Sequence, residues 1–363
     1  MRLDVGAALV DGELVPGDVE VVDGRVAEVG LARGRSGAIA VPGFVDLQVN
    51  GFAGVDFLTA SPGEYAQAGE ALLATGVTAF QPTFISAPEH ALVEGLEAVP
   101  REPIGPRLLG VHLEGPFISP RRLGTHPEQH RRDPDVELLE RLLSAGPVSE
   151  MTLAPELPGA GELIVRLLDA GVVVSLGHTD ATAAEANVAF DLGVATVTHV
   201  FNAMRRFQPR DPGVAGAALT RPDVIVQMIL DGHHLADETA QLTWASASGR
   251  VALVTDATAG AAAPRGRYSI GGIEIVVADG VPRRPDGVLA GTALTMIQAI
   301  RNLHALGVDL PQAVAAASAV PARILGRPEL GRLAPGGPAD VVVLDDRLEV
   351  AHVLVGGESR VLA

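Results

Sequence analysis

The chain has 363 residues, of which 47% are hydrophobic, 20% charged and 3% aromatic, and its formal net charge at neutral pH is −17. This composition is typical of a folded protein with one large and one smaller domain, and the negative charge argues against binding to nucleic acid or to anionic membranes. The absence of cysteine excludes disulfides and thiolate chemistry, and the absence of lysine excludes Schiff bases and a carboxylated lysine that bridges two metal ions.

Short strands and turns are expected at both ends of the sequence. Near the start, Asp23–Gly24 lies between the apolar runs Val19–Val22 and Arg25–Val29, a pattern that predicts a β-hairpin. Near the end, three further runs have this character: Asp340–Leu344, Val350–Val355 and Ser359–Leu362. We therefore expect residues 1–42 and 335–363 to form one small β-sandwich domain.

Between these ends, near-continuous apolar runs alternate with stretches rich in alanine, leucine and glutamate. Such runs are typical of parallel strands buried on both faces, with helices between them. The strand-like runs are Phe44–Val49, Thr78–Phe84, Leu108–Leu113, Met151–Ala154, Val172–Leu176, Ala195–Val200, Ile225–Leu230 and Val251–Thr255. Eight units predict an α/β fold, a (β/α)₈ TIM-type barrel over residues 43–334. A doubly wound open sheet is the alternative, but no Gly-x-Gly-x-x-Gly motif follows a strand.

Several segments depart from the barrel pattern. Pro116–Pro134 follows the third strand, is polar and lacks periodicity, which favours a mobile lid. Residues 267–288, after the eighth strand, resemble an inserted hairpin. Two helices, Leu294–Leu306 and Leu310–Ile324, are then expected to lead back to the terminal sheet.

Polar residues with metal-binding or proton-transfer chemistry stand at the ends of five strand-like runs. They are Glu114 on the third run, His178 on the fifth, His199 on the sixth, His234 on the seventh and Asp256 on the eighth. The carboxyl ends of barrel strands form one rim, so these side chains should converge. A single histidine in a strand is more often an ordinary core residue, but five polar residues on separate strand ends favour a metal site. Imidazole and carboxylate ligands suit Zn²⁺ or Fe²⁺.

Asp256 follows an apolar strand that carries no other charge. A carboxylate beside a metal-activated water can take a proton and later pass it to a leaving nitrogen, which makes Asp256 the candidate acid/base. Its alternative role is to cap the helix that follows. His112, on the third run, either supports the site or only packs.

These motifs resemble one family, the N-acetylglucosamine-6-phosphate deacetylases of the amidohydrolase superfamily. The matching segments are Pro42–Asp46, His112–Phe117, Gly124–His126, Leu153–Glu156, Gly177–Thr179, Thr198–Met204, Asp231–His234, Val254–Ala257 and Leu294–Met296. They run nearly the whole length of the chain. The Glu-Gly-Pro-Phe and His-x-Phe-Asn-Ala-Met strings are specific to this family, whereas Pro-Gly-Phe-x-Asp marks only the superfamily.

The resemblance implies roles for the residues at the strand ends. Glu114, His178 and His199 would bind one divalent metal ion per subunit, zinc or alternatively iron or another divalent ion. Asp256 would be the catalytic acid/base. His126, on the predicted lid, would hydrogen-bond the acetyl carbonyl and stabilise the oxyanion.

The resemblance also implies how a sugar phosphate is held. His234, the backbone of Asn202 and Ala203, and Arg210 would bind it, with Arg210 reaching across the interface of a homodimer. A guanidinium suits bidentate phosphate binding and would supply local positive charge in an acidic protein. Two neighbours, Arg205 and Arg206, compete with Arg210 for this role.

One departure from the superfamily concerns the number of metal ions. Many amidohydrolases carry His-x-His after the first strand and hold two metals, but this chain has Gln48-Val49-Asn50 there. Amides are poor zinc ligands compared with imidazole, which favours a single metal ion. Whether a second ion binds near Gln48 and Asn50 stays open.

The expected reaction is metal-dependent hydrolysis of the N-acetyl group of N-acetylglucosamine 6-phosphate to glucosamine 6-phosphate and acetate, in amino-sugar catabolism or cell-wall recycling. The alternatives are another amidohydrolase, acting on N-acyl-amino acids or cyclic amides, and a non-catalytic scaffold. No signal peptide or membrane span is recognisable, so a cytoplasmic enzyme without nucleic-acid or membrane partners is expected.

Overall fold

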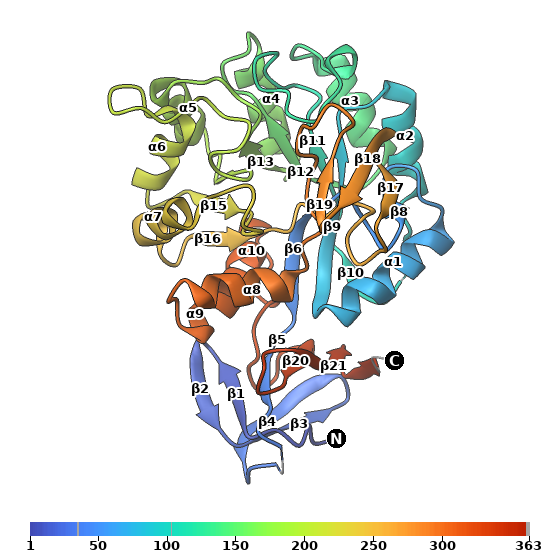
Figure 1. Ribbon diagram of the computed structural model, residues 1–363, viewed down its shortest axis with the longest axis vertical. Helices are drawn as coiled ribbons and strands as arrows, with labels where there is room; N and C mark the ends of the chain where they lie inside the picture. The colour runs from blue at the N-terminus through green and yellow to red at the C-terminus, as the bar shows by residue number, and fades with distance from the viewer. Residues whose placement is uncertain (35, 103, 361–363) are drawn as a thin grey trace.

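Eight parallel strands form a nearly closed barrel, and each arises from one of the apolar runs predicted as strands (Figure 1). The computed structural model describes residues 1–34, 36–102 and 104–360. The barrel strands are β6 (Phe44–Val49), β9 (Val77–Ile85), β11 (Val111–Glu114), β12 (Val148–Leu153), β13 (Val173–Leu176), β14 (Thr196–Val197), β15 (Ile225–Met228) and β16 (Val251–Leu253). The predicted (β/α)₈ TIM-type barrel is confirmed. The third run differs in detail, because Gly110, with φ +89°, separates a short strand β10 (Arg107–Leu108) from β11.

The barrel closes between its first and last strands. The backbone N–H groups of Asn50 and Gly51 both donate to the carbonyl oxygen of Ala257, at 2.8 and 3.1 Å. Below them, the carboxylate of Asp46 accepts from the hydroxyl of Thr255 at 2.6 Å and from its backbone N–H at 3.2 Å. This closure brings the polar end of β6 next to the residues that follow β16.

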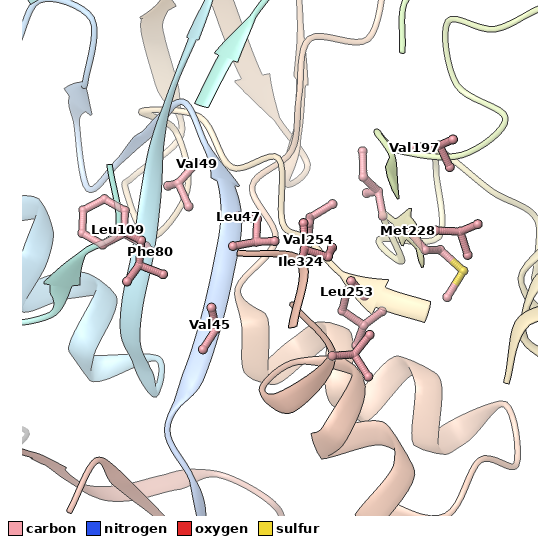
Figure 2. Close-up of a cluster of buried hydrophobic side chains, with 14 of the residues drawn as sticks. Val45, Leu47, Val49, Phe80, Leu109, Val197, Met228, Leu253, Val254 and Ile324 are labelled. Atoms are coloured by element: carbon pink, nitrogen blue, oxygen red, sulfur yellow. The ribbon is translucent and has the colours of Figure 1, made fainter. Parts of the chain in front are cut away.

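Side chains alternate along the first barrel strand, as the two-residue period of a β-strand requires. Val45 and Leu47 are apolar, fully buried and part of the main core, together with Ile324 of the last helix (Figure 2). Asp46 and Gln48 alternate with them along the strand and bond across the barrel to Thr255 and Glu114, respectively. The side chains that this strand adds to the main core are therefore apolar, and those that it directs into the barrel are polar.

Helices follow most of the strands and cover the barrel. They are α1 (Pro62–Ala74), α2 (Glu89–Ala98), α3 (Val136–Ala145), α4 (Ala160–Asp169), α5 (Ala183–Asp191), α6 (Gly213–Thr220), α7 (Asp237–Ala247), α8 (Met296–Ala305), α9 (Leu310–Ala316) and α10 (Ala319–Ile324). The first begins with a capping box, in which Ser61 accepts from the backbone of Glu64 and Glu64 accepts from the backbone of Ser61. No helix in the described residues is long and apolar enough to cross a membrane.

The single helix predicted over Leu310–Ile324 is wrong, because the chain breaks into α9 and α10 at Ala317 and Ser318. Proline has no N–H, so Pro321 cannot bond the carbonyl of Ala317 as a continuous helix would require. The backbone N–H of Val45 bonds that carbonyl instead, at 2.9 Å. The break thus attaches the last helix to the first barrel strand.

Both ends of the chain contribute to one six-stranded sheet, as predicted (Figure 1). Its order is β2 (Glu13–Pro16), β1 (Ala7–Val10), β5 (Ile39–Pro42), β20 (Val341–Leu344), β21 (Val350–Val355) and β22 (Glu358–Arg360). The predicted Asp23–Gly24 hairpin forms as β3 (Asp18–Val22) and β4 (Arg25–Leu31), and a separate apolar cluster joins the hairpin to the sheet. Val361 and Leu362, predicted as strand, lie outside the described residues. The domain boundaries, residues 42 and 335, stay predictions.

The segment inserted after the eighth strand is a three-stranded antiparallel sheet, where the sequence indicated a hairpin. Its strands are β17 (Gly266–Ile270), β18 (Ile273–Ala278) and β19 (Val281–Arg283). It packs against Ile85, the last residue of β9. A short ribbon, β7 (Gly51–Phe52) and β8 (Val55–Asp56), follows the first barrel strand near it. We refer to β17–β19 as the inserted hairpin.

Candidate active site

Four of the polar residues singled out in the sequence meet in the wall of one cavity. Glu114 is the last residue of β11, His178 and His199 stand two residues beyond β13 and β14, and Asp256 stands three residues beyond β16. Because the strands are parallel, these positions share the carboxyl-terminal rim of the barrel. A cavity of about 270 Å³ opens at this rim, and all four side chains line it.

Three of these side chains form a group that could hold a metal ion. The Nε2 atoms of His178 and His199 lie 3.0 and 2.9 Å from Oε1 of Glu114, and 3.1 Å from each other. All three residues are buried. Burial by itself would raise the pKa of Glu114, but the surrounding imidazoles of His126, His178 and His199 outweigh it and hold the pKa well below its usual value. The carboxylate is therefore ionised.

The tautomer of His178 supports a metal at this point. Its Nδ1 lies 2.9 Å from the carbonyl oxygen of Arg122, and a carbonyl can only accept, so Nδ1 carries the proton. In the neutral tautomer, which is the form that binds metal ions, Nε2 then has a lone pair that faces a carboxylate oxygen of Glu114. Two lone pairs at this distance repel unless a cation lies between them. Two imidazole nitrogens and a carboxylate are a donor set that suits Zn²⁺ or Fe²⁺, so these residues fit a divalent ion.

Two amide side chains from the first strand contact the site carboxylates. Nε2 of Gln48 donates to Oε1 of Glu114 at 3.1 Å, and Nδ2 of Asn50 donates to Oδ1 of Asp256 at 2.7 Å. Burial and the nearby charge of Glu114 raise the pKa of Asp256 to about 7. At neutral pH this carboxyl group is thus close to the balance between holding and releasing a proton, which is the condition for general acid/base catalysis.

His126 presents an N–H to the same cavity. The backbone N–H of Ser86 donates to its Nδ1 at 3.2 Å, so in the neutral ring the proton is on Nε2. This Nε2 lies 3.8 Å from Oε2 of Glu114. Burial lowers the pKa of His126 to about 4, which keeps the ring neutral. Although the sequence placed His126 on a lid, the residue is only 3% exposed.

The backbone at the rim is strained. His178, His199 and Asp256 have φ values of +47°, +31° and +50°, in the left-handed region that residues with a side chain seldom occupy. Conformations of this kind persist where the surrounding structure holds them, and they cluster at functional sites. The strain turns each side chain from the end of its strand toward the cavity.

His234 lines the cavity as a member of a carboxylate–imidazole pair. Its Nδ1 lies 2.8 Å from Oδ2 of Asp231, and Oδ1 of Asp231 accepts from the backbone N–H groups of His233 and His234, both at 2.9 Å. Burial opposes the charged form of His234, but the hydrogen bond and charge of Asp231 prevail and raise its pKa. This favours a cationic ring beside the cavity.

The remaining candidates for substrate binding lie in the loop after β14. Asn202 and Ala203 line the cavity, whereas Arg210 is exposed and is not among the described residues of its wall. Arg205 pairs with Asp211 at 2.6 Å. Among the residues that the structure describes, no carboxylate pairs with Arg210.

Sequence reasoning missed one wall of the cavity and left one histidine open. Ile85, Ile270, Val288 and Leu289 line the cavity, the last three in or beside the inserted hairpin. Apolar residues in a β-pattern carry no functional signal, so the sequence offered no way to find them. His112 lies behind the site, with Nε2 2.7 Å from the hydroxyl of Thr152, and is not in the wall.

Comparison with known proteins agrees with this geometry. A sequence profile of the amidohydrolase family matches residues 39–360. The chain is 38% identical over 349 residues to N-acetylglucosamine-6-phosphate deacetylase of Homo sapiens, covering 90% of this chain and 84% of that protein. It is 33% identical over 360 residues to N-acetylgalactosamine-6-phosphate deacetylase of Escherichia coli O157:H7, covering 96% of each.

A solved structure is similar over the whole chain. It is a variant of the Mycobacterium smegmatis N-acetyl-D-glucosamine-6-phosphate deacetylase in complex with N-acetyl-D-glucosamine-6-phosphate, with a TM-score of 0.94 and 36% identity, covering 100% of this chain and 99% of that chain. The chain therefore belongs to the amidohydrolase family, in the branch formed by the N-acetylglucosamine-6-phosphate deacetylases.

Proposed function

We propose that this chain hydrolyses the N-acetyl group of N-acetylglucosamine 6-phosphate, releasing acetate and glucosamine 6-phosphate. One observation carries the proposal: in a chain of this family, the Glu114, His178 and His199 group meets Asp256 and His126 in a single cavity. A proton acceptor, a hydrogen-bond donor and a potential metal site at one point are the requirements of metal-assisted amide hydrolysis.

Glu114, His178 and His199 would hold one divalent ion, for which we propose zinc, with iron or another divalent ion as alternatives. When bound, such an ion supplies Lewis-acid chemistry, because it lowers the pKa of water and polarises an amide carbonyl. Gln48 holds the carboxylate of Glu114 from the side. With amides rather than histidines at Gln48 and Asn50, we propose a single ion.

Asp256 would move the proton. In its ionised form the carboxylate takes a proton from the attacking water, whose oxygen forms the new bond to the acetyl carbon. As the carbon–nitrogen bond breaks, Asp256 passes the same proton to the departing amine, and acetate and the free amino sugar are left. The bond from Asn50 occupies Oδ1 and leaves Oδ2 for this exchange.

His126 would stabilise the charge that develops on the acetyl oxygen. Its Nε2–H is available because Nδ1 is engaged by Ser86. A neutral, buried donor aimed at a developing oxyanion contributes more than the same donor in water, because little reorganisation is needed.

The phosphate would be held by cationic side chains and backbone N–H groups in another part of the cavity wall. His234, whose pKa is raised by Asp231, lines the cavity in this chain together with Asn202 and Ala203. We propose that Arg210 of a second copy completes this site in a homodimer. Its exposure supports this role, as does the neighbouring Phe207, an apolar ring that is 52% exposed.

An assay of the purified protein on N-acetylglucosamine 6-phosphate, N-acetylgalactosamine 6-phosphate and unphosphorylated N-acetylglucosamine tests the substrate, with metal content measured on the same preparation. We expect acetate release from the first substrate and about one divalent ion per chain. Failure to release acetate, together with the absence of bound metal and of a response to added Zn²⁺, would favour a non-catalytic scaffold. Inactivity on all three sugars, with hydrolysis of N-acyl-amino acids or cyclic amides by the same metal-loaded preparation, would favour another amidohydrolase.

We also propose a cytoplasmic location for the enzyme, because phosphorylated sugars are retained there.

Arg210→Ala tests the dimer and the phosphate contact together. We expect KM for the phosphorylated sugar to rise about 10- to 100-fold, the value of a charged hydrogen bond, and KM for the unphosphorylated sugar to change little. Arg206→Ala, at the exposed neighbour that competes for this role, is compared with it: the larger rise in KM identifies the arginine that holds the phosphate. A monomer in solution that retains tight phosphate discrimination would contradict the role of a second copy.

A further inference from the structure

One side of the active-site cavity is apolar, although the proposed chemistry requires only polar groups. This side includes Ile85 at the end of β9, Ile270 at the end of β17, and Leu289 in the segment after β19. Ile85 and Ile270 are 3% and 2% exposed. The proposed reaction gives none of these side chains a part in proton transfer or metal binding, so their place in the wall has another cause.

Ile85 and Ile270 are rigidly packed rather than loosely exposed to the cavity. With Ile275 and Ala290 they form a small apolar cluster that is separate from the main core of the barrel. The turn between β17 and β18 lies directly on this cluster, because a Cβ atom on Gly271 would come within 2.5 Å of Cγ1 of Ile85. The inserted hairpin is therefore fixed against the barrel at the cavity.

A buried carboxylate fastens the inserted hairpin to the barrel. Oδ2 of Asp56 accepts from the hydroxyl of Ser269 at 2.7 Å and from the backbone N–H of Gly272 at 3.4 Å. Oδ1 accepts from the backbone N–H of Leu58 at 3.2 Å. A carboxylate that is 8% exposed is costly unless its oxygens are bonded, and two of its three partners belong to the inserted hairpin. Asp56 thus connects the ribbon after the first barrel strand to β17.

The apolar wall stands next to the proposed oxyanion donor. Ser86, which follows Ile85, contacts Nδ1 of His126 through its hydroxyl at 3.0 Å. Thr125 donates its hydroxyl proton to the carbonyl oxygen of Leu289 at 2.9 Å. In an N-acyl group the alkyl part is attached to the same carbon as the carbonyl oxygen. If that oxygen faces His126, the alkyl part lies against the neighbouring apolar wall.

We propose that Ile85 and Ile270 limit the length of the acyl group that the enzyme removes, and that Asp56 is a positioning residue that holds the inserted hairpin in place for this purpose. An acetyl methyl fits against the wall, and each additional methylene collides with it. This inference rests on the proposed deacetylase function and extends it to the specificity for the acyl group.

Selectivity among acyl groups measures the effect. For the metal-loaded enzyme, kcat/KM is compared on N-acetyl-, N-propionyl- and N-butyrylglucosamine 6-phosphate. One methylene in a hydrophobic pocket changes kcat/KM by about 10- to 200-fold. We therefore expect Ile270→Ala and Ile85→Ala each to raise the ratio of butyryl to acetyl activity by about tenfold or more. Ile270→Val, which removes less volume, is expected to raise the propionyl ratio alone.

Ile273→Ala is the matched control. Ile273 lies on the same inserted hairpin and packs on the same cluster, but it is absent from the described wall of the cavity. We expect an unchanged acyl ratio in this variant. The inference would be overturned if the acyl ratio were the same in wild type as in Ile270→Ala, Ile270→Val and Ile85→Ala. It would also be overturned if Ile273→Ala changed the ratio as much as those variants do. Wild-type enzyme inactive on all three substrates would instead overturn the proposed function, and the inference with it.

The role of Asp56 has its own test. Asp56→Ala frees the inserted hairpin and is expected to raise the butyryl to acetyl ratio. Asp56→Asn keeps an oxygen that accepts from Ser269 and is expected to restore the wild-type ratio. A lower melting temperature in Asp56→Ala with an unchanged ratio would show that the residue only stabilises the fold and would overturn its positioning role.

Discussion

Two layers of polar side chains lie inside the barrel, and they differ in how completely they are paired. The rim layer contains Glu114, His178, His199 and Asp256 with the amides Gln48 and Asn50. The inner layer contains Asp46, His112, Glu150, Gln227 and the hydroxyls of Thr152, Ser175, Thr198 and Thr255. Both layers are buried. Among the described residues, three of the four buried side-chain atoms without a hydrogen-bond partner belong to the rim layer: Gln48 Oε1, Asn50 Oδ1 and His199 Nδ1.

The inner layer is a nearly closed hydrogen-bonded network. Nε2 of Gln227 donates to Oε1 of Glu150 at 2.7 Å. The hydroxyl of Thr198 lies 2.6 Å from that of Thr152 and 2.5 Å from that of Ser175. A buried polar group whose hydrogen-bonding positions are all used by its neighbours has no atom left to contact a ligand. A group with an unused donor or acceptor atom can bind a ligand or react. Pairing, rather than residue type or burial, separates the two layers.

The largest expected effect is that of Asp256→Asn in the rim layer. The variant is expected to fold and to bind metal, because an amide oxygen still accepts from Asn50. It would lose the proposed proton acceptor, so kcat should fall by about 10³-fold or more. Steady-state assays give the loss, and circular dichroism checks the fold.

Asp46→Asn is the matched change in the inner layer. The amide does not touch the site, but it weakens the hydrogen bonds to Thr255. We therefore expect the free energy of unfolding to fall. We expect kcat to stay within about tenfold of wild type, because Asp46 would act only through packing. Wild-type turnover in Asp256→Asn, or equal losses in the two variants, would remove the distinction between the layers.

Removal of metal should affect only the rim layer. Dialysis against a chelator is expected to abolish activity, and added Zn²⁺ to restore it. A ligand that binds only the folded state stabilises it, by about 2.7 kcal/mol when the free ligand concentration is one hundred times Kd. The melting temperature therefore rises. This increase should be seen in wild type and in a variant of the inner layer, but not in His199→Ala. An increase in His199→Ala would place the ion elsewhere.

Glu150→Gln tests the inner layer through pH. Burial raises the pKa of Glu150 from 4.5 to about 8, so between these values the folded protein holds a proton that the unfolded chain releases. The free energy of unfolding therefore falls as pH rises through this window, by about 5 kcal/mol. The variant cannot ionise at this position, so its stability should depend less on pH. Urea unfolding at pH 5, 7 and 9 compares the slopes, and identical slopes would contradict the prediction.

The smallest effect is expected from Ser175→Ala. Its hydroxyl contacts that of Thr198 at the far end of the inner network. Loss of this bond should lower stability by about 1 kcal/mol and leave kcat/KM unchanged. Thermal unfolding and the deacetylation assay together measure both. A large fall in activity would show that the inner layer takes part in the chemistry.

Much of the site was predictable because strand ends are visible in the sequence. Glu114, His178, His199, His234 and Asp256 each follow an apolar run, and the geometry of a parallel barrel places such positions on one rim. The helix break before Pro321 was not predicted, because proline is usually tolerated near the start of a helix. The N–H of Val45, which bonds the free carbonyl of Ala317, comes from a distant part of the chain.

Contacts between distant parts of the chain were beyond the sequence. Asn50 and Asp256 are 206 residues apart and meet only because the barrel closes between β6 and β16. Ile85 and Ile270 meet only because the inserted hairpin folds back onto β9. Neither contact leaves a periodic pattern, so neither could be predicted.

The barrel, the small sheet shared by both ends, and the residue types at the rim could be predicted from the sequence, because they depend on the local period of apolar residues and on the residue at each strand end. The folded structure was needed to show which polar groups are paired, that His126 is buried with a defined tautomer, and that an apolar wall bounds the cavity. Those properties depend on distances between segments far apart in the chain, and free energies of pairing and burial are set by such distances.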